Sequence, residues 1–428
     1  MPMHRHQHLC LAVAVLLLAI PEAFTAQTSR GTRGGQPAGT ARGTAPARGA
    51  APAATPIVPV DPLPIRYIGG RRFKYVVKAD GSVIGWGPEE GGLAAREPSV
   101  SGRVTEPVPI ALPAPVRQVV SGSNMSYALL DGGTVVAWGM NDSGQFGSGA
   151  GSFRTPANPL RSWVPVSVPG LVDVVEISAA GEHALAVLAD GSVMTWGSGP
   201  NVSARDGMLK VPGLTDVIHA AAAGQHDLFL TREGQVFGWG ANAGGQLGHP
   251  LDVRRIERPA AVAGLPRIVS IGASSTTNFG FSVALDADGR VWTWGSNQSA
   301  TMGHGTFWGG PTGPDAVNDY PVPAIVNGIS NARSLAVGDG HVGVVLADRS
   351  LRLWGHDGWG QLGVGTSGFY SEVPKRPALT DVAALYLVGS ASFAVRVDGS
   401  FYWWGVAATY GGGPFAENRK VPTAVLLP

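Results

Sequence analysis

The sequence of 428 residues is poor in cysteine and in charge. Its one cysteine, Cys10, lies within an apolar run near the N-terminus, which excludes disulfides, thiol catalysis and cysteine metal sites from the chain downstream. Charged residues make up 14% of the chain and the formal net charge is +1. Binding to a phosphate backbone needs a strong positive surface, so we expect no nucleic-acid partner.

The sequence also lacks a long hydrophobic run. The longest one covers residues 9–20, which at 1.5 Å per residue is too short to cross a bilayer core of about 30 Å as a helix. Arg5 precedes this run and small residues near Ala26 follow it, a pattern typical of a secretory signal peptide. We predict a signal peptide over residues 1–26 and a secreted, periplasmic or cell-envelope protein with no membrane span after cleavage. An uncleaved anchor is the alternative.

Signatures of catalysis and of metal binding are missing as well. The chain has no Gly-x-Ser-x-Gly, no His-Glu-x-x-His and no glycine-rich loop that ends in Gly-Lys-Ser/Thr. Asp286 and Asp288 resemble the start of a calcium loop, but its closing glutamate is absent and a hairpin turn is expected there. The sequence therefore predicts no catalytic residue, no metal site and no cofactor.

Glycine and proline, in contrast, are abundant. Residues 27–64 consist mainly of Gly, Ala, Thr, Pro and Arg and predict a disordered spacer. Beyond them a Trp-Gly pair closes a similar segment seven times, with its tryptophan at Trp86, Trp138, Trp196, Trp239, Trp294, Trp354 and Trp404. We interpret these tryptophans as core between neighbouring units.

Each Trp-Gly pair follows a turn and a short apolar strand. The turn is an Asp-Gly or similar dipeptide such as Asp190-Gly191, which permits the positive φ of a two-residue hairpin. One strand precedes the hairpin, and a proline-led strand such as residues 165–168 precedes that one. Seven units of four short strands predict an all-β fold over residues 65–428, a seven-bladed β-propeller of four-stranded antiparallel blades.

The ends of the repeat region suggest how the ring closes. The chain enters its first repeat at residues 65–68, and it ends on a proline-led strand at residues 422–427 with no hairpin after it. We therefore expect the C-terminal strand to pair into the first blade, which would leave no sheet edge open.

Three histidines occupy the same place in their repeats. His183, His226 and His341 each follow a glycine at the start of the hairpin. We interpret them as packing residues whose ring nitrogens bond the backbone, with a shared central ligand site as the alternative.

The repeats resemble the regulator of chromosome condensation 1 repeat family from about Ile65 to Pro428. The resemblance rests on the Trp-Gly, Asp-Gly and Gly-x-His signatures and on Asn-Ala-Gly-Gly-Gln-Leu-Gly at 242–248 and Asp-Gly-Trp-Gly-Gln-Leu-Gly at 357–363. A similar element stands at 141–147, is eroded at 297–303 and is missing from repeats one, three and seven. The resemblance implies a seven-bladed propeller. It also links the chain to secreted propellers that bind a protein through one face, whereas expected export argues against the nuclear members' roles in nucleotide exchange and at chromatin.

The segments between each Trp-Gly pair and the next proline-led strand vary most in length and should share one face of the ring. Large aromatic residues gather in them. We predict that eight of these bind an extracellular or envelope protein: Phe153, Trp163, Phe307, Trp308, Trp359, Phe369, Tyr370 and Tyr410. Phe415 lies on the same rim, and Phe146 is expected to fold inward with its repeated motif. The alternative is that all of these rings staple the loops onto the propeller.

The function that these features favour is an exported, monomeric, non-catalytic module that inhibits or captures a protein. A carbohydrate- or envelope-binding propeller is the second hypothesis, because aromatic loops also stack on sugars, and a lyase or hydrolase is the third. Asp, Asn and Gln around each exposed ring would favour sugar, whereas a broad apolar patch would favour protein.

Overall fold

The structure is a computed structural model that describes residues 63–89, 94–96, 102–148, 160–275, 280–305, 319–366, 368–406, 415 and 417–428. The predicted signal peptide and all but the last two residues of the predicted spacer lie outside these ranges. Within them, no helix has the length and apolar character needed to span a membrane.

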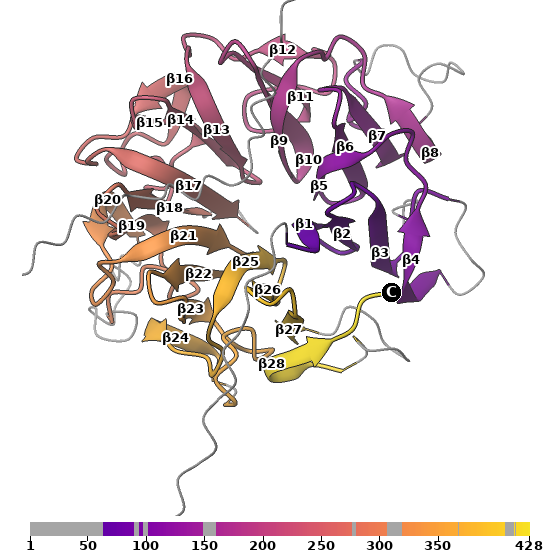
Figure 1. The fold of residues 1–428 in the computed structure, drawn as a ribbon. Coiled ribbons are helices and arrows are strands. Elements are labelled where there is room, and N and C mark those ends of the chain that lie inside the picture. The colour runs from indigo at the N-terminus through magenta and orange to yellow at the C-terminus, as the bar shows by residue number, and fades with distance from the viewer. Residues whose placement is uncertain are drawn as a thin grey trace, which may run out of the picture. The chain divides into compact units, whose positions relative to one another are not determined.

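Strands account for the regular structure of these residues, and they form seven four-stranded antiparallel sheets in a ring, which confirms the predicted propeller (Figure 1). Blade 1 holds β1 (Ile65–Gly70), β2 (Lys74–Lys78), β3 (Val83–Pro88) and β4 (Arg103–Ile110); blade 2 holds β5 (Val116–Ser121), β6 (Met125–Leu130), β7 (Val135–Met140) and β8 (Arg161–Ser167); blade 3 holds β9 (Val174–Ala180), β10 (Glu182–Leu188), β11 (Val193–Ser198) and β12 (Leu209–Lys210). Blade 4 holds β13 (Val217–Ala222), β14 (His226–Thr231), β15 (Val236–Ala241) and β16 (Arg255–Ala261); blade 5 holds β17 (Ile268–Ser275), β18 (Gly280–Asp286), β19 (Val291–Ser296) and β20 (Asp319–Ile325). Blade 6 holds β21 (Ala332–Val337), β22 (His341–Leu346), β23 (Leu351–His356) and β24 (Tyr370–Lys375); blade 7 holds β25 (Val382–Val388), β26 (Ala391–Arg396), β27 (Phe401–Gly405) and β28 (Arg419–Val425).

The chain builds each blade from the inside outwards. The first strand of every blade contacts the first strands of both neighbouring blades around the centre, and the proline-led strand lies outermost. Proline has no N–H to give to a further strand, so it suits an outer edge. Pro165 in β8 and Pro422 in β28 stand in such strands.

The expected closure of the ring is wrong. The C-terminal strand β28 pairs with β27 of its own blade, and blade 1 takes its outer strand, β4, from the adjoining sequence. The proline-led strand is the last strand of a repeat rather than the first. Because the chain starts on the inner strand β1, each blade takes all four strands from one continuous segment, and no strand remains to complete another blade. Blades 1 and 7 close the ring by packing instead: the rings of Tyr67 and Tyr386 lie 6.0 Å apart, and Phe415 stacks on Trp86 at 4.2 Å.

The hairpins between second and third strands define one face of the ring, here called the hairpin face. All seven have the same length, at residues 79–82, 131–134, 189–192, 232–235, 287–290, 347–350 and 397–400. These turns are longer than the predicted two-residue hairpins, and their third residue, such as Gly399 at φ 80°, takes the positive φ. In blade 2 this residue is Gly133 rather than Gly132, and in blade 6 it is Arg349.

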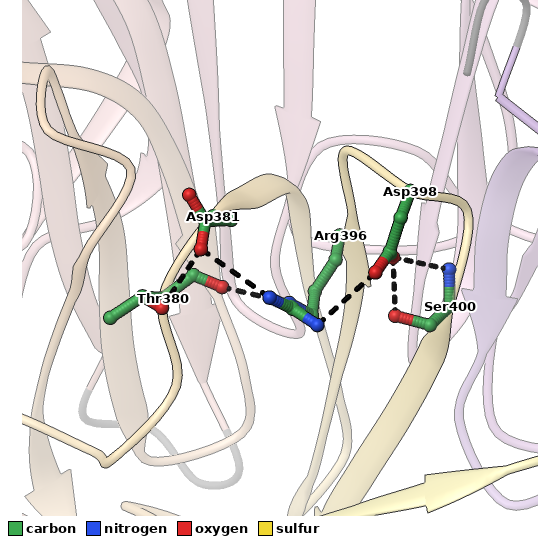
Figure 2. Close-up of polar contacts among 5 residues, drawn as sticks. All are labelled: Thr380, Asp381, Arg396, Asp398 and Ser400. Atoms are coloured by element: carbon green, nitrogen blue, oxygen red, sulfur yellow. Dashed lines mark hydrogen bonds and ion pairs between the residues drawn. The ribbon is translucent and has the colours of Figure 1, made fainter. Parts of the chain in front are cut away.

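The hairpin face satisfies its own polar groups. Figure 2 shows Arg396, whose guanidinium bridges Asp381 at 3.3 Å and Asp398 at 3.2 Å. Asp398 in turn accepts hydrogen bonds from the amide (2.9 Å) and the hydroxyl (2.5 Å) of Ser400. The Ser400 bonds lower the pKa of Asp398, as equivalent serines do for three other hairpin aspartates. Short-range contacts therefore hold these turns.

The seams between blades contain the core. Trp196 is fully buried, and its ring packs edge-on against Tyr127 of blade 2 at 5.6 Å. The glycine after each tryptophan is required by geometry: Gly197 has φ 92°, and a Cβ there would lie 2.2 Å from the carbonyl oxygen of Glu182. This confirms the interpretation of the Trp-Gly tryptophans as core between units.

Loops of the repeated Asn-x-x-Gly-Gln-Leu-Gly type lock one blade to the next. The indole N–H of Trp196 donates to the carbonyl of Gln145 in the preceding blade at 2.9 Å, and Trp404 donates to that of Gln361 at 2.8 Å. The next residue of the loop, Phe146 or Leu362, is buried in the same seam. Phe146 is thus internal, as predicted, and the motif is an inter-blade clamp.

The three recurrent histidines are buried in separate seams, but their predicted backbone bonds are wrong. Each Nε2 reaches a side chain of the next blade: His183 bonds Asp227 at 2.9 Å, His226 bonds Ser282 at 3.1 Å and His341 bonds Ser392 at 3.0 Å. Because the rings lie in different seams, they do not form a shared central ligand site.

Two of these histidines take part in the clamp. Ser282 gives its hydroxyl hydrogen to the carbonyl of Gln246 at 2.7 Å, so Nε2 of His226 must be the donor to Ser282. Ser392 and His341 repeat this arrangement with the carbonyl of Gln361. Burial, with a smaller effect of a second histidine, lowers the pKa of both His226 and His341 to about 3. Both rings are therefore neutral.

Candidate functional site

The loops between third and fourth strands leave the blades at the end opposite the hairpins, because neighbouring strands are antiparallel. They define the loop face. Their lengths differ widely, from residues 199–208 in blade 3 to residues 297–318 in blade 5. The aromatic residues predicted to bind a partner belong to these loops or to the strands that they enter.

The loop of blade 6 is held from within and presents Trp359. The Asp357 carboxylate accepts the amide of Leu362 at 2.9 Å, and the Gln361 side-chain oxygen accepts the amide of Trp359 at 2.9 Å. Leu362 is fully buried, whereas Trp359 is 43% exposed. The clamp thus fixes the backbone and leaves the indole at the surface.

The anchor of this loop carries an unusual charge. Three other loops have asparagine at the position of Asp357, namely Asn141, Asn242 and Asn297, and their side-chain oxygens accept the same amide bond. Burial raises the pKa of Asp357 to about 6, although the amide of Leu362 and the charge of Lys420 oppose the shift. The loop therefore holds its buried carboxylate at some cost near neutral pH.

Phe369 and Tyr370 continue this surface at the start of β24. They are 79% and 36% exposed, and their ring centroids lie 6.5 Å apart. The Tyr370 ring stands edge-on to His356 at 5.4 Å, and Nδ1 of His356 accepts a bond from the Gln361 amide at 2.5 Å. Burial lowers the pKa of His356. The clamp residue Gln361 thus links the Trp359 loop to Tyr370.

Two exposed valines extend the apolar surface. Val373 lies further along β24 and is 43% exposed, and Val421 on β28 is 49% exposed. The blade 6 loop lies against β28, because the amide of Gly365 donates to the carbonyl of Lys420 at 2.8 Å. We call Trp359, Phe369, Tyr370, Val373 and Val421 the blade 6 patch.

One of the other predicted binding residues, Trp163, does not join this patch. Trp163 lies in β8 of blade 2, half-buried, with the Arg161 guanidinium 4.5 Å from its ring centre. Phe415 is fully buried against Trp86, so its predicted place on the rim is wrong. Phe153, Phe307, Trp308 and Tyr410 fall outside the residues that the structure describes.

The sequence analysis missed a polar belt on the inner strands. Glu176 of β9 and Nδ1 of His219 on β13 lie 2.5 Å apart, and Nε2 of His219 donates to the Ile271 carbonyl at 3.1 Å. Burial would lower the pKa of His219, but Glu176 and these bonds outweigh it and raise the pKa. Beside this pair, Gln118 bonds Tyr67 at 3.5 Å. No signal in the sequence could have found the belt, because its residue types do not recur between repeats.

Metal binding finds no support in the geometry of the described ranges. They contain no group of three or more His, Cys, Asp or Glu side chains arranged to hold an ion. The belt around His219 is an internally bonded pair rather than a ligand set.

Family comparisons agree with this architecture. The description "Regulator of chromosome condensation (RCC1) repeat" matches residues 132–187, 233–280 and 288–345, and a second description of the same repeat matches residues 116–145 and 268–300. The chain belongs to the RCC1 repeat family. Its clamp loops and Trp-Gly pairs are the features of that repeat described above.

Curated RCC1 relatives are distant and mostly longer than this chain. It is 27% identical over 338 residues to Protein pim1 of Schizosaccharomyces pombe, covering 72% of this chain and 50% of that protein. It is 27% identical to the mitochondrial RCC1 domain-containing protein RUG3 of Arabidopsis thaliana, at 77% and 63% coverage, and 26% identical to the human Regulator of chromosome condensation, at 77% and 69%. The chain thus spans half to two-thirds of the length of the first two relatives.

Solved structures show the same fold. Prp20p from Saccharomyces cerevisiae matches with a TM-score of 0.67 and 22% identity, covering 82% of this chain and 87% of that one. Human WBSCR16 matches with a TM-score of 0.65 and 20% identity, at 81% and 95% coverage.

Proposed function

We propose that this RCC1-type propeller is an exported, monomeric, non-catalytic module that binds an extracellular or cell-envelope protein through the blade 6 patch. The observation that carries the proposal is the contrast within one loop: Leu362 is buried as an anchor, while Trp359 and Phe369 are 43% and 79% exposed. Since the seam does not need these two rings, their exposure leaves them available to a partner. Aromatic side chains of this kind dominate protein interfaces.

The surroundings of Trp359 favour a protein over a carbohydrate. Sugar sites pair each aromatic ring with polar side chains that bind hydroxyl groups. Here the polar neighbours Asp357, Gln361 and His356 already bond one another or the loop backbone. The exposed valines of the adjoining strands, Val373 on β24 and Val421 on β28, are apolar. A patch of this composition is typical of a protein-binding surface.

Family members support a protein partner in a general way. One solved structure is described as Kap60 bound to yeast RCC1 (Prp20), and another study describes the binding of Prp20p to Gsp1p and histones. Those partners belong to those proteins. For this chain, the signal-peptide pattern of residues 1–26 leads us to propose a partner outside the cytoplasm.

The test is capture of the partner by the full chain, expressed with its own leader and a C-terminal tag in its source cells and cross-linked before lysis. The variants are Trp359→Ala and Phe369→Ser, with Trp163→Ala of blade 2 as the matched control. We expect one protein to co-purify with the wild type and with Trp163→Ala. Each patch variant should reduce its capture about 30-fold, since an interface aromatic contributes roughly 2 kcal/mol.

Two results would contradict the proposal. Equal capture by all four proteins would remove the patch from the binding surface, and capture of glycan alone would favour the carbohydrate hypothesis. Sequencing the N-terminus of the exported protein tests the location separately, because an intact Met1 would contradict cleavage near Ala26.

A further inference from the structure

The seam between blades 3 and 4 lacks the clamp that fills other seams. Residues 199–208 replace the Asn-x-x-Gly-Gln-Leu-Gly loop there. After blades 2, 5 and 6 the tryptophan of the next blade donates its indole N–H to a backbone carbonyl of that loop, for example at 2.8 Å from Trp354 to Thr301 and from Trp404 to Gln361. The equivalent Nε1 of Trp239 is buried and has no hydrogen-bond partner among the described residues.

A cavity of about 300 Å³ lies at this seam. Its lining includes Asn201 and Val202 of the short loop, Trp239 of β15, and Arg255 and Glu257 of β16. Cavities that take ligands range from about 300 to 1,000 Å³. This one is at the lower end, which suits a short chain segment better than a bulky cofactor.

Two donors without partners belong to residues that line the cavity. Trp239 is 5% exposed, and its Nε1 is one of them. The other is Nδ2 of Asn201, which is buried and unpaired. Arg255 donates to Oδ1 of Asn201 at 3.1 Å, so that contact fixes the amide and turns Nδ2 away from Arg255. A buried donor that stays unsatisfied destabilises the fold, so an incoming acceptor that reaches these donors would gain a hydrogen bond from each.

The charge of the cavity favours a neutral acceptor. Nε of Arg255 lies 3.0 Å from the Glu257 carboxylate, and the two charges cancel. A carboxylate ligand would face the negative charge of Glu257, whereas a peptide carbonyl would not. Three of the four clamp seams point to the same chemistry, because Trp196, Trp354 and Trp404 each donate to a backbone carbonyl there.

We propose that this cavity binds an uncharged peptide turn of another protein, which inserts a backbone carbonyl between Nε1 of Trp239 and Nδ2 of Asn201. The turn takes the place that a clamp loop occupies in other seams. This site goes beyond the proposed function, since it shares no residue with the blade 6 patch, and each of the two proposals can fail without the other.

An unpaired indole alone does not make the site. Nε1 of Trp294 is also buried without a partner, but Trp294 is fully enclosed and does not line this cavity. Trp294 is therefore the internal control for Trp239.

The experiment is a titration of the ¹⁵N-labelled full chain, followed by the indole N–H signals in NMR. The probe is the acetylated and amidated peptide Asn-Ala-Gly-Gly-Gln-Leu-Gly, which is the clamp sequence of residues 242–248. Trp239→Phe and Trp294→Phe assign the two signals. We expect a saturable shift of the Trp239 signal, no shift of the Trp294 signal, and an affinity about tenfold weaker in Asn201→Leu, which loses one hydrogen bond.

Each other outcome overturns the proposal. A missing or unsaturable Trp239 shift excludes peptide binding, and an equal Trp294 shift shows that the peptide acts on the seams in general. Acetate is titrated in parallel, and saturation by acetate without saturation by the peptide would make this an oxyanion site. If Trp239→Phe does not fold, the Asn201→Leu variant and the Asn201 side-chain amide signal of the wild type give the same decision.

Discussion

The two faces of the propeller are built on different principles. On the hairpin face, seven turns have equal length, and in four of them a serine donates to the aspartate of the same turn, as Ser400 does to Asp398 in Figure 2. On the loop face, the loops differ in length, and those with the clamp motif bond the following blade, as Gln361 does through Trp404. The loops with the clamp motif therefore both hold the ring together and present residues to solvent.

This difference decides how the loop face should be mutated. Leu362 and Trp359 are three residues apart, yet one is fully buried and the other 43% exposed. A lost binding signal means little unless the altered residue is shown not to support the seam. The hairpin face, in contrast, can be altered with small effects on stability and none on the patch.

The largest effect should come from removing the anchor of the blade 6 loop. Leu362→Ala leaves a cavity in the seam beside Trp404, and we expect it to lower the free energy of unfolding by about 2 to 5 kcal/mol in urea titration. Trp359→Ala should change it by no more than about 0.5 kcal/mol. A similar decrease in the free energy of unfolding for both variants would contradict the assignment of Leu362 as an anchor and Trp359 as a surface residue.

Acid should lower the stability of the fold mainly by protonating the histidines buried in the seams between blades. The pKa of His226 and His341 falls from 6.5 to about 3 on folding, so the unfolded chain binds more protons between these values. Each histidine should then remove about 1.4 kcal/mol of stability per pH unit as the pH falls below 6.5. The double variant His226→Gln, His341→Gln should show a shallower slope of unfolding free energy between pH 6 and 4, in the range set by these pKa values.

The belt histidine gives the control for this measurement, because its sign is opposite. The pKa of His219 is raised on folding, so its contribution is complete below 6.5 and is lost as the pH rises through the raised value. His219→Gln should therefore cost more at pH 5 than at pH 9. An unchanged acid slope in the double variant would contradict the neutral, buried state of the seam histidines.

A smaller gain is expected on the loop face from Asp357→Asn. The pKa of Asp357 rises from 3.8 to about 6 on folding, so the carboxyl favours folding below 3.8 and loses this advantage as the pH passes 6. Asparagine keeps the acceptor without the charge. We expect about 1 to 2 kcal/mol of added stability at pH 7.5 that disappears by about pH 4. A gain that does not depend on pH would point to another cause.

The smallest change belongs to the hairpin face. Arg349 adopts φ 62° where other hairpins have a glycine, such as Gly399. Arg349→Gly should raise the free energy of unfolding by up to about 1 kcal/mol, because glycine takes this conformation without strain. Arg349→Ala keeps the strain and should show no such gain in the same urea titration.

The sequence could predict the number of blades because Trp-Gly recurs in every repeat, an Asp-Gly turn or a close variant precedes it, and each has a steric reason. It could not predict how the ring closes. The proline-led strand could belong to the repeat before it or after it, and only the pairing of β28 with β27 decides. The partners of the histidines could not be predicted for a related reason. His226 and Ser282 are 56 residues apart in the sequence, and they come into contact only because two blades pack together.

The candidate site was predictable only in part. Phe146 occupies the leucine position of a repeated motif, so its burial could be read from the pattern. Phe415 lies in a loop without the motif, and nothing in the sequence separates it from Phe369, although one is fully buried and the other 79% exposed. For the cavity lined by Asn201 and Trp239, the sequence contained one indication, the missing clamp motif of repeat three. Whether that gap leaves a cavity depends on which side chains fill the seam, and the sequence does not show this.

The most direct test of the account is amide hydrogen exchange of the full chain with and without its captured partner. We predict that the partner slows exchange at residues 357–375 and 419–425, around the blade 6 patch, and leaves the hairpins at 347–350 and 397–400 unchanged. Slower exchange at the hairpins, with none at the patch, would contradict the assignment of binding to the loop face.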